Sequence, residues 1–106
     1  MKKRILIANR SEIAIRIIRS AHKLGLVAVA LKSDKDPDAL YLNYADEIIY
    51  AHDALNATSV FLDGELIVRL AVENNIDLIH PGYGFLSENP DFAQLCVDNN
   101  INFVGP

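Results

Sequence analysis

The sequence has no tryptophan and a single cysteine, Cys96. An internal disulfide is therefore excluded, and a reducing compartment is expected. Long apolar runs are also missing, since none approaches the roughly 20 residues that a membrane-spanning helix needs. The basic start is followed by only four apolar residues, Ile5–Ala8, which is too short for the core of a signal peptide. We expect a cytoplasmic protein without a membrane partner, or a mitochondrial matrix protein if a transit peptide was removed.

A basic excess is absent as well. The formal net charge is −4, and charges of either sign are spread along the chain. A nucleic-acid-binding surface needs basic residues gathered on one face, so we expect no nucleic-acid partner. Apolar residues make up 51% of the chain and charged residues 23%, which is typical of a globular protein. A length of 106 residues suits one compact domain.

Apolar, β-branched runs alternate with segments of helical periodicity, which predicts an α/β domain. Five parallel strands with right-handed crossovers would carry helices on both faces, giving a Rossmann-like sheet. Ligands of such sheets gather at the carboxyl ends of the strands. The expected strands are 4–8, 27–31, 47–50, 78–80 and 102–104, and the expected helices are about 10–24, 38–44, 64–74 and 90–99. Asp63 and Asn89 are expected to cap the last two helices. The first helix has an apolar stripe at helical spacing, which we expect in the core: Ile13, Ala14, Ile17, Ile18, Ala21 and Leu24.

The first strand-to-helix turn, residues 8–12, contains no glycine. A dinucleotide site needs glycines there so that the backbone can approach a pyrophosphate. Glu12 would in addition repel phosphate at the helix N-terminus. We interpret Asn9 and Glu12 as a capping box, with a ligand role for these two residues as the alternative.

Residues 80–90, HPGYGFLSENP, form the most unusual segment. Its two glycines flank Tyr83 and permit positive φ angles and close approach by another group. The alternative is a glycine-rich turn whose Phe85 and Leu86 enter the core. His80 alone favours a hydrogen-bonded residue at a strand end over a catalytic group.

The remaining polar residues give weaker signals. Arg16, Arg19 and Lys23 share one face of the first helix, which predicts either a solvated surface or a charged subunit interface. Cys96 lies on the apolar side of its helix and is expected in the core. No metal-ligand spacing or nucleophile–base pair is visible. Three alternating aspartates lack calcium-loop spacing and are interpreted as solvated turn residues: Asp34, Asp36 and Asp38.

Four segments together resemble the biotin carboxylase family, and they occur in the family's order over the entire chain. A single one would be a weak signal, but the four together are highly specific. They are ILIANRSEIAIR at 5–16, ADE at 45–47, HPGYGFLSEN at 80–89 and FVGP at 103–106.

The resemblance implies the N-terminal part of a larger enzyme. That enzyme would use ATP, Mg²⁺ and bicarbonate to make carboxyphosphate, which carboxylates biotin on a carrier protein. Residues 1–106 would form the domain that precedes an ATP-grasp domain, with the ATP-grasp and C-terminal domains beyond this chain. The end of the chain, a strand running into a turn, also suggests a truncated protein or an excised domain. The segment would therefore hold no catalytic residue, bind no cofactor alone and be inactive by itself.

The resemblance also assigns residues. Tyr83 and Gly84 would border the biotin pocket, and Glu88 would support the loop. Arg16 and Arg19 match the first helix of the bacterial dimer. The implied partners are a biotin carboxyl carrier protein or domain, a carboxyltransferase component and, in the parent, a second copy of the enzyme.

Two positions depart from the family pattern. Ser11 stands where the family normally has glycine, which adds bulk in the first turn. Lys23 stands where the bacterial subunit commonly has an acidic residue, so an ion pair across the dimer would be lost.

Two other functions remain open. The chain could precede the ATP-grasp domain of another ligase, such as carbamoyl-phosphate synthetase, although residues 80–89 argue against it. It could also be a non-catalytic α/β assembly module. The final carboxyl acceptor is not determined by this segment.

Overall fold

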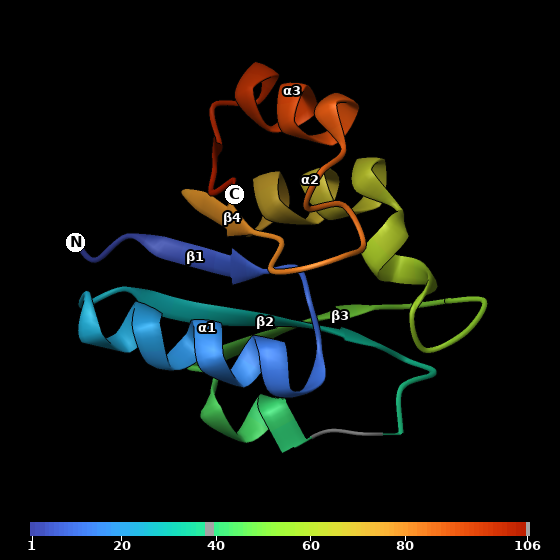
Figure 1. Ribbon diagram of the computed structural model, residues 1–106, viewed down its shortest axis with the longest axis horizontal. Helices are drawn as coiled ribbons and strands as arrows, with labels where there is room; N and C mark the ends of the chain where they lie inside the picture. Colours follow the sequence, from blue (N-terminus) through green and yellow to red (C-terminus); the bar gives the residue numbers. More distant parts are fainter. Residues whose placement is uncertain (38–39, 106) are drawn as a thin grey trace.

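The computed structural model describes residues 1–37 and 40–105, and these form a five-stranded parallel sheet with helices on both faces (Figure 1). The spatial order β3-β2-β1-β4-β5 places β1 in the centre, and every neighbouring pair is parallel. The predicted Rossmann-like architecture is confirmed. The strands are β1 Arg4–Ile7, β2 Val27–Ser33, β3 Glu47–Ala51, β4 Leu78–His80 and β5 Asn102–Phe103.

The helices divide between the two faces of the sheet. In Figure 1, α1 and η1 lie below β2, whereas α2 and α3 lie on the opposite side. Their bounds are α1 Ser11–Lys23, η1 Leu40–Tyr44, η2 Ser59–Leu62, α2 Gly64–Glu73 and α3 Pro90–Asp98.

The two short helices, η1 and η2, refine the sequence prediction. The expected helix 38–44 is a 3₁₀ helix over its described part, and residues 38 and 39 lie outside the described residues. The 3₁₀ helix η2 was not predicted, because four residues carry too little periodicity to be recognised.

Apolar residues of the strands fill two layers. In β1, Leu6 packs with the layer under α2 and α3, whereas Ile5 and Ile7 pack with the layer under α1. This alternation follows from the two-residue period of a strand. Because both faces of β1 are covered, its sequence is a continuous apolar run.

The helix N-termini were predicted with mixed success. Asp63 accepts a hydrogen bond from the Leu66 amide at 3.1 Å, and Asn89 accepts one from the Phe92 amide at 3.0 Å, as expected for caps. The predicted Asn9–Glu12 capping box is wrong. Arg10 takes the cap position of α1 without a side-chain cap bond, because the Asn9 amide turns toward the loop after β4.

The apolar side of α1 is wider than its core contact. Ala14, Ile18 and Ala21 are buried as predicted, but Leu24 is 76% exposed. Ile17 is only half-buried. One apolar flank of α1 is therefore left uncovered by the described part of the chain. Among residues 1–37 and 40–105, no helix has the length and apolarity needed to cross a bilayer.

Candidate functional site

The carboxyl ends of β1 and β4 mark the candidate site. The chain leaves β1 toward β2 on one side, whereas β4 lies on the other side of β1. Such a switch point in strand order is where open α/β sheets bind ligands. The turn after β1 and the loop after β4 therefore meet at the ligand edge of the sheet.

The loop after β4 separates its aromatic residues. Tyr83 is 78% exposed, whereas Leu86 is buried. The Phe85 ring packs on Phe61 with centroids 5.3 Å apart. Phe85 and Leu86 therefore enter the core, as the interpretation of a glycine-rich turn predicts, whereas Tyr83 is exposed to solvent.

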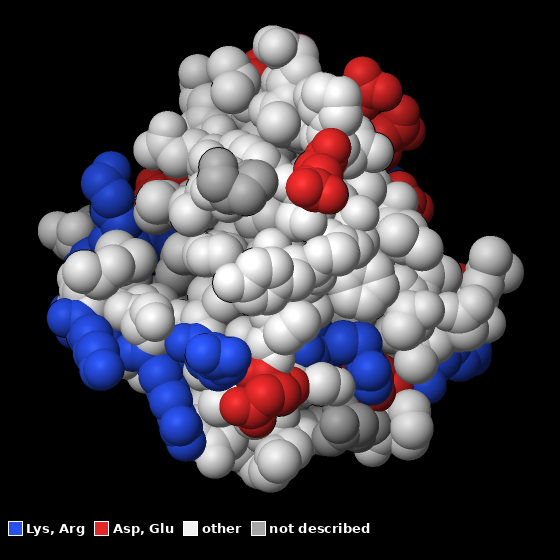
Figure 2. All heavy atoms as spheres, viewed as in Figure 1, with Lys and Arg blue, Asp and Glu red and all other residues white. Residues whose placement is uncertain are grey.

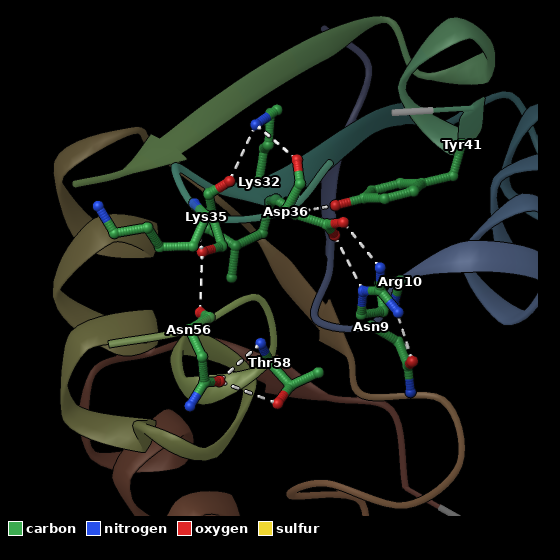
Figure 3. Close-up of polar contacts among 10 residues, drawn as sticks. Asn9, Arg10, Lys32, Lys35, Asp36, Tyr41, Asn56 and Thr58 are labelled. Carbon is green, nitrogen blue, oxygen red and sulfur yellow. Dashed lines mark hydrogen bonds and ion pairs between the residues drawn. The ribbon is translucent and has the colours of Figure 1, made fainter. Parts of the chain in front are cut away.

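Asn9 joins the two segments. Its side chain is buried, and its Nδ2 donates hydrogen bonds of 2.8 Å to the carbonyls of Pro81 and Tyr83. Its Oδ1 accepts the Arg10 amide at 2.8 Å (Figure 3). All polar atoms of the amide group are thus used within the protein, which accounts for its burial.

Gly82 fits between these contacts because it has no side chain. A Cβ at this position would lie 2.8 Å from both Asn9 Nδ2 and Ile13 Cγ2. The Gly82 amide donates to His80 Nδ1 at 3.1 Å. Burial lowers the pKa of His80, which favours the neutral ring that can accept this hydrogen bond. His80 is therefore a hydrogen-bonded strand-end residue, as predicted.

An open groove of about 780 Å³ lies between the loop and the uncovered flank of α1. Tyr83, Gly84 and Glu88 line it from the loop. Arg16 and Ile17 line it from α1. The structure thus brings the three loop residues and Arg16 to one groove.

Arg19 and Lys23 are exposed on α1, outside the lining of the groove. The Arg19 guanidinium lies 5.4 Å from the centre of the Tyr44 ring, within cation–π range. In Figure 2, Lys and Arg side chains gather mainly over α1. This part of the surface is basic although the whole chain is acidic.

His22 and Asp46 extend the same side of the molecule. His22 Nε2 and Asp46 Oδ2 are 2.8 Å apart. The Ala28 amide donates to the same carboxylate oxygen at 2.8 Å. The hydrogen bond from Ala28, assisted by His22, holds the pKa of Asp46 below its ordinary value. The contact connects the end of α1 to the start of β3.

A buried ion pair lies at the neighbouring strand end, after β2. Arg10 donates from Nε and one Nη atom to the two carboxylate oxygens of Asp36, and the Asp36 side chain is fully buried (Figure 3). The prediction that Asp36 is a solvated turn residue is wrong, because Arg10 compensates its charge in the interior. Asp34 is exposed as expected, and Asp38 lies outside the described residues.

Sequence reasoning missed both the contacts of Asn9 with the loop after β4 and the Arg10–Asp36 pair. Asn9 is 74 residues from Tyr83, and Arg10 is 26 residues from Asp36. The available signal was their position at the ends of buried strands, where a polar side chain needs a partner.

Cys96 is buried, as predicted, and burial raises the pKa of its thiol to about 11. A thiol with such a pKa is inert at neutral pH. In the described ranges, no three His, Cys, Asp or Glu side chains gather as a metal site would require.

Comparison with known proteins identifies the family of this chain. Residues 1–106 match the family model described as "Biotin carboxylase, N-terminal domain". The chain belongs to this family. Biotin carboxylase 1 of Bacillus subtilis (strain 168) is 49% identical over 106 residues, which are 100% of this chain and 23% of that protein. Human mitochondrial pyruvate carboxylase is 43% identical over 104 residues, which are 98% of this chain and 9% of that protein.

Solved structures of biotin carboxylases also match this chain. The biotin carboxylase domain dimer of Hydrogenobacter thermophilus 2-oxoglutarate carboxylase, in complex with MgADP, ADP and bicarbonate, matches with a TM-score of 0.90 and 44% identity. The match covers 100% of this chain and 23% of that one. The Campylobacter jejuni biotin carboxylase–β,γ-ATP complex matches with a TM-score of 0.88 and 45% identity, over 100% and 24% of the two chains. The chain thus spans less than a quarter of these relatives.

Proposed function

We propose that this chain is the first domain of an ATP-dependent biotin carboxylase. Bicarbonate attacks the γ-phosphate of ATP to give carboxyphosphate and ADP, and the carboxyl group then passes to the ureido nitrogen of carrier-bound biotin, with release of phosphate. The observation that carries the proposal is the family match over residues 1–106, joined to 49% identity with a Bacillus biotin carboxylase.

We propose that an ATP-grasp domain and a C-terminal domain follow this domain in the parent enzyme. The support is that the chain corresponds to 23% of the Bacillus relative. ATP and Mg²⁺ belong to these further domains in the proposal. The solved complex with MgADP and bicarbonate supports these ligands for the family. The parent would work in the cytoplasm, or in mitochondria as the human pyruvate carboxylase does by its name.

Tyr83, Gly84 and Glu88 are proposed to border the biotin pocket. The exposed Tyr83 ring and the apolar flank of α1 face one groove, which suits a small and mostly apolar bicyclic ligand. Gly84 borders open space, since a Cβ there would meet no atom within 4 Å other than those of its chain neighbours. The groove would be completed by the rest of the parent.

Arg16, Arg19 and Lys23 are proposed to form part of an interface between two copies of the parent. Their exposure on one side of α1 supports this, as does the domain dimer of the Hydrogenobacter relative. A biotin carboxyl carrier protein or domain and a carboxyltransferase component are the other proposed partners. Relatives that include pyruvate and methylcrotonoyl-CoA carboxylases support both.

The test is an ATPase assay on the full-length parent. ATP hydrolysis should require bicarbonate and should accelerate when free biotin is added. The 106-residue chain, assayed alone at the same concentration, should be inactive because it lacks the phosphate-binding groups that stabilise the transition state. ATP hydrolysis that ignores both bicarbonate and biotin would contradict the proposal.

A further inference from the structure

We propose that Asn9 is a positioning residue for Tyr83, and that its amide fixes the turn that presents the Tyr83 ring to biotin. The inference rests on the proposed function, in which Tyr83 borders the biotin pocket. It assigns a role to a side chain that sits behind the groove and does not touch the proposed ligand.

The first support is the geometry of the clamp. Asn9 Nδ2 donates to the carbonyls of Pro81 and Tyr83, both at 2.8 Å, and these two residues flank Gly82. One amide group therefore holds both sides of the turn. Asn9 is only 2% exposed, so water does not readily replace these bonds.

The second support is the backbone conformation of the turn. Gly82 and Gly84 each have φ of +69°, and Phe85 has φ of +45°. Glycine adopts positive and negative φ about equally readily, so Gly82 and Gly84 do not fix the turn by themselves, and its conformation depends on the contacts that surround it. The Asn9 bonds are part of these surroundings, together with the Ala8 amide, which donates to the His80 carbonyl at 2.9 Å.

The third support is the exposure of the ring itself. Tyr83 is 78% exposed, so core packing contributes little to its position. The backbone of residues 82–84, which Asn9 clamps, then determines where the Tyr83 side chain leaves the loop. Loss of the amide should displace the ring without removing any atom from the groove.

The experiment uses Asn9→Ala and Asn9→Ser in the full-length parent. The matched control is Asn74→Ala, which removes an equivalent 2.8 Å bond from Asn74 Nδ2 to the Leu70 carbonyl at the end of α2. KM for free biotin and kcat are measured at saturating ATP and bicarbonate. Hydrogen exchange of residues 82–84 is followed in the 106-residue chain.

Both Asn9 variants should raise KM for free biotin roughly tenfold, while kcat and the KM for ATP change less than about twofold. Exchange at residues 82–84 should accelerate in these variants and stay unchanged in Asn74→Ala. If Asn9→Ala does not fold, Asn9→Ser decides, because it keeps a polar group at the buried position but cannot reach both carbonyls.

Tyr83→Ala separates the two ways in which the inference could fail. If Tyr83→Ala raises KM for biotin and the Asn9 variants do not, the positioning role is overturned and the proposed function stands. If neither Tyr83→Ala nor the Asn9 variants alter KM, Tyr83 does not border the pocket, and the inference falls with that assignment. If kcat falls and the KM values for ATP and for biotin rise by similar factors, the role of Asn9 is purely structural.

Discussion

The Arg10 guanidinium donates two hydrogen bonds to the Asp36 carboxylate. The bond from Nε is 2.9 Å long, and the bond from an Nη atom is 2.7 Å long. The pair ties the turn after β1 to the turn after β2. The Asp36 side chain is fully buried, whereas 24% of the Arg10 side chain is exposed. In dinucleotide-binding sheets a carboxylate near the end of the second strand commonly receives a ribose. Here that carboxylate is already engaged by an internal cation.

Removal of Arg10 should therefore destabilise the domain strongly. Arg10→Met takes two charge-assisted hydrogen bonds from a buried carboxylate, and we expect the free energy of unfolding to fall by roughly 3 kcal/mol or more. Lys35→Met, which removes an exposed cation from the same turn, is the control and should stay within about 0.5 kcal/mol of the wild type. Urea unfolding of the 106-residue chain measures both. Equal midpoints for the two variants would contradict the importance of the pair.

Ser11 occupies a conformation that suits glycine. Its φ is +58°, in the left-handed region, at the position where the resemblance implies a glycine. Ser11→Gly should raise the free energy of unfolding by about 0.5–1 kcal/mol, since relief of backbone strain exceeds the added entropy of the unfolded chain. Ser20→Gly, within α1, should lower it by about 0.5 kcal/mol. Chemical denaturation distinguishes the two signs, and a loss in Ser11→Gly would refute the strain.

The fold was predictable because its signals are local. Continuous apolar runs identified the strands. Asp63 and Asn89 identified helix starts, because each accepts a hydrogen bond from the amide three residues further along the chain. The resemblance also identified Ser11 as a departure from an expected glycine, and its positive φ is a conformation that glycine adopts readily. Patterns of this kind depend on neighbours along the chain, which a sequence displays directly.

The contacts of the site were not predictable for the opposite reason. Asn9 follows a strand and precedes a helix, so capping was the local solution, yet its partners lie at Pro81 and Tyr83. Asp36 lies among polar turn residues, and only the folded sheet brings Arg10 to it. Long-range pairing of buried polar groups depends on tertiary structure that periodicity does not encode.

His80 should make the domain less stable in acid. Burial lowers its pKa from the ordinary 6.5, so its contribution is fully present above pH 6.5 and is lost as the pH falls through the lowered value. Protonation of Nδ1 also removes the acceptor of the Gly82 amide. Between pH 7 and 5, the unfolding free energy should fall more steeply in the wild type than in His80→Gln. His52→Gln, at an exposed position, should keep the wild-type slope, and an NMR pKa of His80 at or above 6.5 would reject the explanation.

Tyr83→Ala tests the proposed biotin rim in the parent enzyme. Because the side chain is mostly exposed, stability should change by less than about 0.5 kcal/mol. Loss of the aromatic wall should raise KM for free biotin roughly tenfold, with a smaller effect on bicarbonate-dependent ATP binding. Tyr50→Ala, at another exposed tyrosine on β3, should leave both unchanged. If the use of biotin and the binding of ATP weaken by the same factor, the loop has a structural role only.

Arg19→Glu tests the proposed interface on α1. Arg19 stacks on Tyr44, and both residues are exposed on the described domain. Reversal of the charge removes the cation–π contact and places a carboxylate where the proposal expects a cation to meet a second copy. Sedimentation velocity of the parent should therefore show a dissociation constant at least about tenfold weaker, which corresponds to 1.4 kcal/mol. Arg69→Glu makes the same charge change at an exposed position on α2, on the opposite face of the sheet, and should leave association unchanged. Because the two variants carry the same net charge, a difference between them reports the location of the interface, and identical sedimentation profiles would exclude α1 from it.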